Sequence, residues 1–351
     1  MERVIDQPRS SAALTPAQPG HGVARDGLSA TAPSVGSAGR WPELPWQDWE
    51  PTISTLHMWA QIVGKIRLAL TPPINHWWHV PLYVSARGLT TTAIPYDDSV
   101  LQLEFDFVDH RLVVTDGQPG TFAMELAPRS VADFYRELMA GLRGRGIEVK
   151  IRPRPVEVVR AIPFEEDELH HEYDSVHAER FWRGLVQADR VLKVFRSRFV
   201  GKASPVHFFW GGFDLAATRF SGRPAPAHPG GIPNCPDSVM IEAYSHQLWS
   251  AGWWPLSEAP GPAFYAYAYP EPEGFRRASV QPADAFYEPV LREYLLPYDA
   301  VRDTARPDTA VLEFLQSTYE AAADLGGWDR PALEITERPA LPPAVSGSLG
   351  R

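Results

Sequence analysis

The chain has 351 residues, 44% of them hydrophobic, which suits two packed units or one large domain with a substantial core. Its formal charge of −10 argues against a nucleic-acid-binding surface, and no apolar run approaches the roughly 18 residues of a membrane span. The single cysteine, Cys235, excludes an internal disulfide, so we expect a reducing compartment, the cytoplasm.

Both ends of the chain are expected to lack a fold. Residues 1–40 are rich in Ser, Ala, Pro and Gly and show no apolar periodicity, which predicts a disordered N-terminal tail. Order is expected to begin at the tryptophan-rich segment from Trp41. The composition of residues 338–351 predicts a second disordered tail.

The first half, residues 41–160, is predicted to form a helix, antiparallel strands and a second helix. Apolar residues from Ile53 onward fall at helical spacing, and Pro72-Pro73 ends this helix. Alternating apolar residues predict strands near residues 79–87, 101–107, 111–115 and 122–126. Ser130, followed three residues later by Asp133, resembles a capping box and opens the closing helix.

The second half, residues 161–337, repeats this order with longer insertions. A long amphipathic helix is predicted from Phe181 to Phe199, where apolar residues step by four and three. Strands are predicted at residues 213–220, 238–248, 263–269 and 290–296. A final helix begins near Val311, and Gly326-Gly327 is a natural stop for it.

Two segments of the chain echo each other. Each begins at a proline, Pro73 or Pro205, passes through a histidine and paired aromatic residues, and ends near an arginine. We therefore predict an α+β fold made of two related helix/antiparallel-strands/helix lobes packed as one body. His76 should occupy the position equivalent to His207, and a small-molecule cleft should lie between the lobes.

Four sequence runs resemble a known family. Residues 46–60, 75–80, 206–223 and 242–246 are similar to a bacterial family known only as domain of unknown function 5996. The resemblance covers about residues 41–337. It implies no activity, substrate, cofactor or catalytic residue, so the chemistry must be argued from side chains.

Familiar motifs for nucleotide, zinc and hydrolase sites are absent from the sequence, so no cofactor and no metal are expected. Three histidines and two acids lie between His170 and His177, but their intervals of three residues drift around a helix instead of forming a metal cluster. A solvated approach to a helix is the preferred interpretation. Cys235 has no visible base beside it and is expected to have no role.

Glu242, Tyr244 and His246 form the first candidate site. On a strand they would project from one face, which would align a carboxylate, a phenol and an imidazole for acid–base work or ligand binding. The alternative is a polar sheet face with internal hydrogen bonds.

The second candidate site surrounds the second histidine–aromatic segment and comprises His207, Trp210, Asp214, Arg219 and Arg223. Gly211-Gly212 would let the backbone approach another group closely, while Arg219 or Arg223 could hold a carboxylate or phosphate. Alternatively, Asp214 pairs with Arg219 and braces the segment. The first segment would add His76, His79 and Arg87 to the ligand-binding side of the cleft.

These candidates leave three classes of function open. In a cofactor-free enzyme, His246 or His207 would be the general base beside Glu242, and Arg219 would orient a small anionic substrate. In a binding or sensing module, the same groups would hold a small-molecule ligand without chemistry. A structural or interaction protein would use an aromatic surface instead. The oligomeric state does not follow from the sequence.

Deletion of residues 1–40 is expected to shift the melting temperature by no more than a few degrees, because nothing in this segment can form a core. Thermal denaturation of the full chain and of the truncated chain measures the difference. A larger loss on truncation contradicts the prediction.

Overall fold

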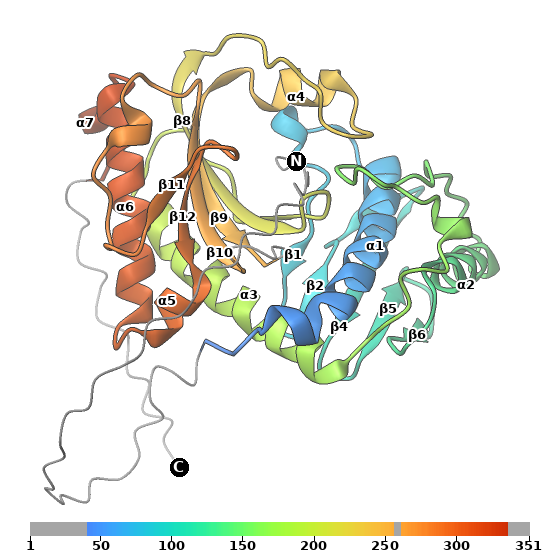
Figure 1. Ribbon diagram of the computed structural model, residues 1–351. Helices are drawn as coiled ribbons and strands as arrows, with labels where there is room; N and C mark the ends of the chain where they lie inside the picture. Colours follow the sequence, from blue (N-terminus) through green and yellow to red (C-terminus); the bar gives the residue numbers. More distant parts are fainter. Residues whose placement is uncertain (1–40, 256–260, 336–351) are drawn as a thin grey trace, which may run out of the picture.

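The computed structural model describes residues 41–255 and 261–335, and the predicted tails lie outside these ranges. Helices and two antiparallel sheets make up the described part, which confirms the predicted α+β class (Figure 1). The α-helices are α1 (Trp46–Leu70), α2 (Val131–Gly144), α3 (Ser175–Arg196), α4 (Asp237–Ala243), α5 (Tyr298–Asp303), α6 (Pro307–Leu325) and α7 (Arg330–Leu333). Three short 3-10 turns are η2 (Asn75–Trp77), η3 (Phe164–Glu166) and η4 (Phe275–Arg277).

The first sheet lies in the first half of the chain. Its strands are β1 (Tyr83–Val84), β2 (Gly88–Thr90), β3 (Ile94–Tyr96), β4 (Ser99–Asp106), β5 (Arg111–Thr115) and β6 (Phe122–Glu125), in the order β1-β2-β4-β5-β6 with β3 also on β4. The apolar face of this sheet packs against α1 and α2. Phe134 of α2 stacks on Trp59 of α1 at 4.7 Å, with Phe105 of β4 at 6.5 Å. Ser130 caps α2 as predicted.

The second sheet lies in the second half. Its strands are β7 (His207–Phe209), β8 (Asp214–Pro224), β9 (His246–Trp254), β10 (Ala263–Tyr269), β11 (Phe286–Glu288) and β12 (Glu293–Pro297), in the order β11-β12-β10-β9-β8-β7. Helices α3 and α6 cover one face, where Trp249 lies 5.4 Å from Phe195 and 5.6 Å from Tyr319. We call this the outer face. The opposite, inner face looks toward α1 (Figure 1).

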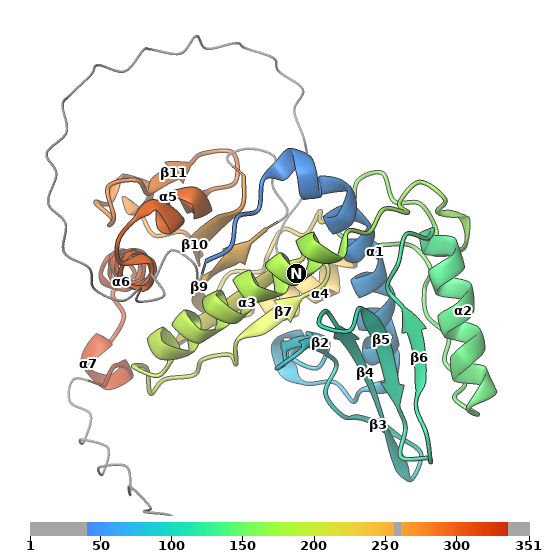
Figure 2. The same cartoon turned by 90° about the horizontal axis from the view of Figure 1, so that it is seen from below.

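The two sheets meet at their edges. Leu82, just before β1, exchanges two backbone hydrogen bonds of 2.9 Å with Phe208 of β7. Helix α3 crosses from the second sheet to the first half of the chain (Figure 2). There its Phe181 lies 5.6 Å from Trp49 of α1. The two halves therefore share one continuous core.

The predicted duplication is not confirmed. Each half does run through a helix, an antiparallel meander and a closing helix. However, His76 lies in the η2 turn before β1, whereas His207 begins strand β7. The two histidines therefore do not hold equivalent positions.

Two strand predictions need correction. Residues 238–248 were expected to be extended, but Asp237 to Ala243 form helix α4 and strand β9 begins only at His246. Pro236 at the N-cap and an acidic first turn favour this helix start. The strand predicted over residues 79–87 is reduced to Tyr83–Val84, because the Ser85 hydroxyl accepts a hydrogen bond from Gly88 N and turns the chain.

Helix α1 is surrounded by protein on all sides. Every residue from Thr55 to Arg67 is buried, so this helix cannot have a conventional solvent-facing stripe. The Trp210 ring approaches the backbone of α1 closely at Gly64, where an added Cβ would lie 2.3 Å from the ring. The glycine is thus required for Trp210 to pack on the helix.

Gly64→Ala is expected to destabilise the protein by about 1–3 kcal/mol, because overpacking against a buried indole outweighs the gain of about 1 kcal/mol in helix propensity. Gly144→Ala in α2 is the matched control, since nothing lies within 4 Å of an added Cβ there. Urea denaturation measures both variants. Equal stabilisation by the two substitutions contradicts the expected clash.

Candidate functional site

The inner face of the second sheet carries two of the predicted site residues, His207 and Asp214. The strand register places His207, Ala216, Gly252 and Tyr265 in one row across β7, β8, β9 and β10. In a neighbouring row, the Thr218 and Ser250 hydroxyls are 2.9 Å apart. Nearly all of these polar side chains are buried. A polar face of this kind is retained inside a protein only where hydrogen bonds or function support it.

His207 is enclosed by aromatic rings from both halves. Its ring lies 5.9 Å from Trp78, 5.6 Å from Tyr83 and 5.4 Å from Phe209. The side chain is fully buried, and neither ring nitrogen has a hydrogen-bond partner within the described ranges. Burial lowers the pKa of His207 to about 3, so the imidazole is neutral at neutral pH.

His76 is hydrogen-bonded at both ring nitrogens. Nδ1 donates to the Ala243 carbonyl at 3.0 Å, and Nε2 accepts from the Lys202 ammonium at 2.7 Å. Burial lowers the pKa of His76, consistent with the neutral form that this pattern requires. The His246 ring lies 5.7 Å away. A cavity of about 20 Å³, large enough for one water molecule, lies beside His76, Phe209 and Thr218.

Glu242, Tyr244 and His246 do not share a strand face, which corrects the first candidate site. Glu242 is exposed on α4, whereas Tyr244 is buried beyond the helix end with its hydroxyl 3.1 Å from that of Tyr267. The chain turns between these residues, so alternation does not apply. Helix α4 still packs on η2, and the Glu242 carboxylate raises the pKa of His76 against the larger effect of burial.

Arg219 does not converge with His207. Its Cα partner is Trp249, so its side chain lies on the outer face, 3.7 Å from the Phe195 ring and 4.4 Å from the Tyr319 ring. It donates to the Phe195 carbonyl at 2.7 Å. Burial lowers its pKa to about 10. Side chains alternate between the two faces along β8, so Arg219, five residues after Asp214, lies on the opposite face.

The remaining predicted residues are engaged elsewhere. Asp214 accepts a hydrogen bond from the Tyr265 hydroxyl and does not pair with Arg219. Arg87 is half-exposed and paired with Asp106 at 2.7 Å, and Arg223 donates to the Gly326 carbonyl at the end of α6. His79 Nδ1 accepts from Ile74 N at 3.1 Å. None of these contacts forms a common binding surface.

Sequence reasoning missed a polar stripe on α1. His57, Gln61 and Lys65 are spaced by four residues and so lie on one side of the helix, which is otherwise largely apolar. His57 Nε2 donates to the Gly211 carbonyl at 2.8 Å, and burial lowers its pKa to about 4. The Trp210 ring centroid lies 5.8 Å from Lys65 Nζ. The spacing of three polar residues was the available signal.

Gln61 also clamps the segment that carries Glu157. Its amide donates to the Val156 carbonyl at 2.7 Å and accepts from Val156 N at 2.9 Å. On the other side, Glu157 N donates to Pro233 O and the Asn234 amide donates to Val158 O, both at 2.8 Å. The segment is therefore held between α1 and the loop that contains Cys235.

Glu157 itself is fully buried and adopts a φ of 61°, a left-handed conformation that is unusual for a non-glycine residue. Its Oε1 lies 2.1 Å from where a Cβ on Gly211 would sit. Gly211 thus allows the carboxylate to approach the β7–β8 turn. The sequence predicted that another group would approach the backbone at Gly211-Gly212, and at Gly211 that group is the Glu157 carboxylate.

Lys65, Glu157, Trp210 and Cys235 form what we call the junction cluster. Burial, helped by the positive charge of Arg152, lowers the pKa of Lys65 to about 8. Burial and the nearby Glu157 carboxylate raise the pKa of Cys235 to about 11, so its thiol stays protonated. No described residue accepts a hydrogen bond from Lys65 Nζ, although the side chain is only 5% exposed.

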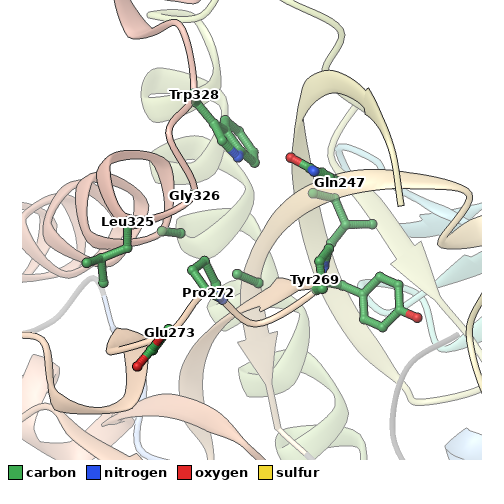
Figure 3. Close-up of a pocket in the computed structure, with 11 residues that line it drawn as sticks. Gln247, Tyr269, Pro272, Glu273, Leu325, Gly326 and Trp328 are labelled. Atoms are coloured by element: carbon green, nitrogen blue, oxygen red, sulfur yellow. The ribbon is translucent and has the colours of Figure 1, made fainter. Parts of the chain in front are cut away.

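A larger cavity of about 210 Å³ lies between β9, β10 and the end of α6. Trp328 and Gln247 stand on opposite sides of it, and Glu273 lies near its rim (Figure 3). Its lining contains no histidine, lysine or arginine. This groove therefore lacks the groups that the chemistry considered above requires.

The acidic and histidine-rich segment before α3 has structural contacts. His170 Nδ1 lies 2.8 Å from Asp167, and Asp174 caps α3 by accepting from Val176 N and His177 N. In the described ranges, no three His, Cys, Asp or Glu side chains are grouped to hold a metal ion. Nor is any helix in those ranges long and apolar enough to cross a membrane.

The chain belongs to DUF5996, a family of unknown function, whose model matches residues 41–335. This confirms the family resemblance seen in the sequence. No curated protein and no solved structure is similar enough to count as a match. Function is therefore inferred from the geometry alone.

His207 makes stability depend on pH in a defined direction. Its pKa is about 3 in the folded protein and about 6.5 in the unfolded chain, so the unfolded state binds more protons between these values and stability falls as pH drops below 6.5. At pH 5 this costs about 2 kcal/mol, a cost that His207→Phe removes. Urea denaturation of both proteins at pH 7 and pH 5 is the measurement. A stability difference that does not change with pH contradicts the assignment.

Proposed function

We propose that this member of the DUF5996 family is an enzyme that acts on a small molecule at the junction between its two halves. Lys65 and Glu157 would be the reacting groups. The observation that carries the proposal is a lysine side chain that is only 5% exposed, lies on an enclosed stretch of α1 and has no hydrogen-bond acceptor among the described residues. Loss of hydration disfavours its charged form, so a purely structural helix would be expected to carry an apolar residue here.

The lowered pKa of Lys65 suits it to act as a base or nucleophile. With a pKa of about 8, roughly a fifth of the amine is neutral near pH 7.4, against about one part in a thousand for an ordinary lysine. The Trp210 ring supplies an apolar wall beside the amine. These conditions favour nucleophilic or acid–base chemistry by an amine.

Glu157 supports the proposal through its position. Four hydrogen bonds from α1 and from residues 233–234 hold its backbone segment, although the left-handed φ costs on the order of 1–3 kcal/mol. Strain of this kind persists where the surrounding structure fixes a side chain for a purpose. A carboxylate fixed in this way against the β7–β8 turn provides a proton donor or acceptor.

This proposal changes the roles expected from the sequence. Arg219 cannot orient a substrate from the outer face, and Arg152 replaces it as the nearby cation for an anionic group. His207, with a pKa of about 3, is too weak a base to remove a proton efficiently at neutral pH. His246 and Glu242 stay beside His76, outside the proposed reacting pair.

A non-catalytic binding module is the second candidate. The His76 ring, held by hydrogen bonds at both nitrogens, lies 5.4 Å from the Trp78 ring and 4.7 Å from the Phe220 ring. This group of rings would hold a ligand by stacking, without transforming it.

A metabolite screen by thermal shift tests the two candidates. A ligand at 100 times its Kd should stabilise the fold by about 2.7 kcal/mol. Incubation then separates them, because turnover of the bound compound supports the enzyme and an unchanged compound supports the binding module.

Lys65→Met is expected to lower kcat by at least about 100-fold while leaving stability unchanged or higher, since methionine fills the same space without a buried charge. Activity should rise with pH through about 8 as the amine loses its proton. Lys150→Met, at an exposed site, is the matched control and should keep full activity. Turnover by Lys65→Met at the unaltered rate rules out this role.

A further inference from the structure

We infer that the cavity of about 210 Å³ at the end of α6 is a second site, which binds a small organic ammonium compound with an apolar body. We call it the helix-end cavity. No residue of the junction cluster lines it. The inference therefore goes beyond the proposed function and does not depend on it.

The size and walls of the helix-end cavity suit a small ligand with an apolar part. Its volume is about ten times that of the one-water cavity beside His76, yet smaller than the roughly 300 Å³ of pockets for drug-sized molecules. Apolar side chains from β9, from the loop after β10 and from the end of α6 line it, among them Leu248, Pro270, Pro272 and Leu325. Removing the apolar part of a ligand from water is therefore favourable here.

Trp328 provides the aromatic wall of the cavity. Its ring meets Tyr319 edge to face at 6.0 Å and lies over Gly326, where an added Cβ would be 3.0 Å from its Nε1. Tyr269 also lines the cavity, but its ring points away and its hydroxyl donates to the Pro226 carbonyl at 3.1 Å (Figure 3). An indole face attracts an ammonium group through the charge distribution of the ring.

The charges at the cavity favour a cation. Glu273 is its one charged lining residue, exposed near the rim (Figure 3). Arg276, three residues further along the chain, is already paired with Glu271 at 2.7 Å. The lining contains no histidine, lysine or arginine that would repel a cationic ligand. A ligand ammonium group can therefore pair with the Glu273 carboxylate.

The end of α6 adds a second source of negative potential. This helix has 19 residues and ends at Leu325 on the cavity wall, and its last turn contains no basic residue. The C-terminal end of a helix carries a partial negative charge, which a cation usually complements. Arg223 donates to the Gly326 carbonyl but does not line the cavity. The formal charge of −10 for the whole chain also favours cationic over anionic ligands.

Isothermal titration calorimetry of the full chain with two probes tests the inference. Phenethylamine combines a benzene ring with a primary ammonium group, and 2-phenylethanol has the same ring and chain length with a hydroxyl in its place. At pH 7 and low salt, phenethylamine is expected to bind at least about tenfold more tightly, a difference of about 1.4 kcal/mol. Added salt should reduce this preference, because the Glu273 carboxylate is exposed.

Two substitutions locate the bound probe. Glu273→Gln keeps the shape of the exposed side chain and should weaken phenethylamine at least about fivefold, while 2-phenylethanol binds as before. Glu148→Gln, at an exposed carboxylate in the first half of the chain, is the matched control and should change neither affinity. Trp328→Leu keeps an apolar wall and should weaken phenethylamine more than 2-phenylethanol, because only the ammonium group gains from the indole face.

Three results would overturn the inference. Equal affinity for the two probes shows that the ammonium group is not recognised. Phenethylamine binding that Glu273→Gln leaves unchanged places the probe elsewhere on the protein. Absence of heat from both probes at millimolar concentration shows that the cavity does not take such a compound. None of these results bears on turnover at the junction cluster, which Lys65→Met tests separately.

Discussion

The structure depends on one helix that is buried on every side. From Thr55 to Arg67, α1 has no solvent-facing residue, because α2 and the first sheet, α3, and the β7–β8 turn enclose it from different directions. Trp59 meets Phe134 on one side and Trp49 meets Phe181 on another. Each side chain in this stretch of α1 therefore packs against a neighbour, and each polar side chain needs a hydrogen-bond partner or a functional role.

The polar stripe of α1 shows how this requirement is met. His57 and Gln61 are satisfied by backbone groups of the β7–β8 turn and of the segment before Glu157. In meeting that need they fix two distant parts of the chain against each other. Lys65, four residues further on, continues the stripe but has no acceptor among the described residues. Helix α1 thus packs against both halves and also places the Lys65 ammonium, which has no acceptor among the described residues, where the two halves meet.

Glycine makes these close approaches feasible. The Trp210 indole occupies the space that a side chain at Gly64 would fill, and the Glu157 carboxylate occupies the space that a side chain at Gly211 would fill. Trp210 and Gly211 are adjacent, so one short turn receives both α1 and Glu157. A substitution at either glycine moves the tryptophan or the carboxylate, and so couples core packing to the geometry of the junction cluster.

Local patterns in the sequence determined much of the secondary structure. Period-two apolar runs gave β5 and β10 with the bounds found, and proline and glycine marked the ends of α1 and α6. These features depend on neighbours along the chain, which a sequence displays directly. The same local reasoning failed at α4, where Pro236 and Asp237 start a helix within a segment that alternates like a strand. Local sequence patterns singled out the histidines of the inner face, but they could not show which residues contact them.

Tertiary structure alone decided the site. The sequence placed Arg219 with His207, yet strand alternation and the covering helices put the arginine on the opposite face. Lys65, Glu157 and Cys235 are separated by about 80 to 90 residues at each step, and nothing local links them. The segments that carry them are joined because Gln61 holds Val156 and Asn234 holds Val158. Burial, a property of the whole fold, then lowers the pKa of Lys65 and so distinguishes it from the three exposed lysines.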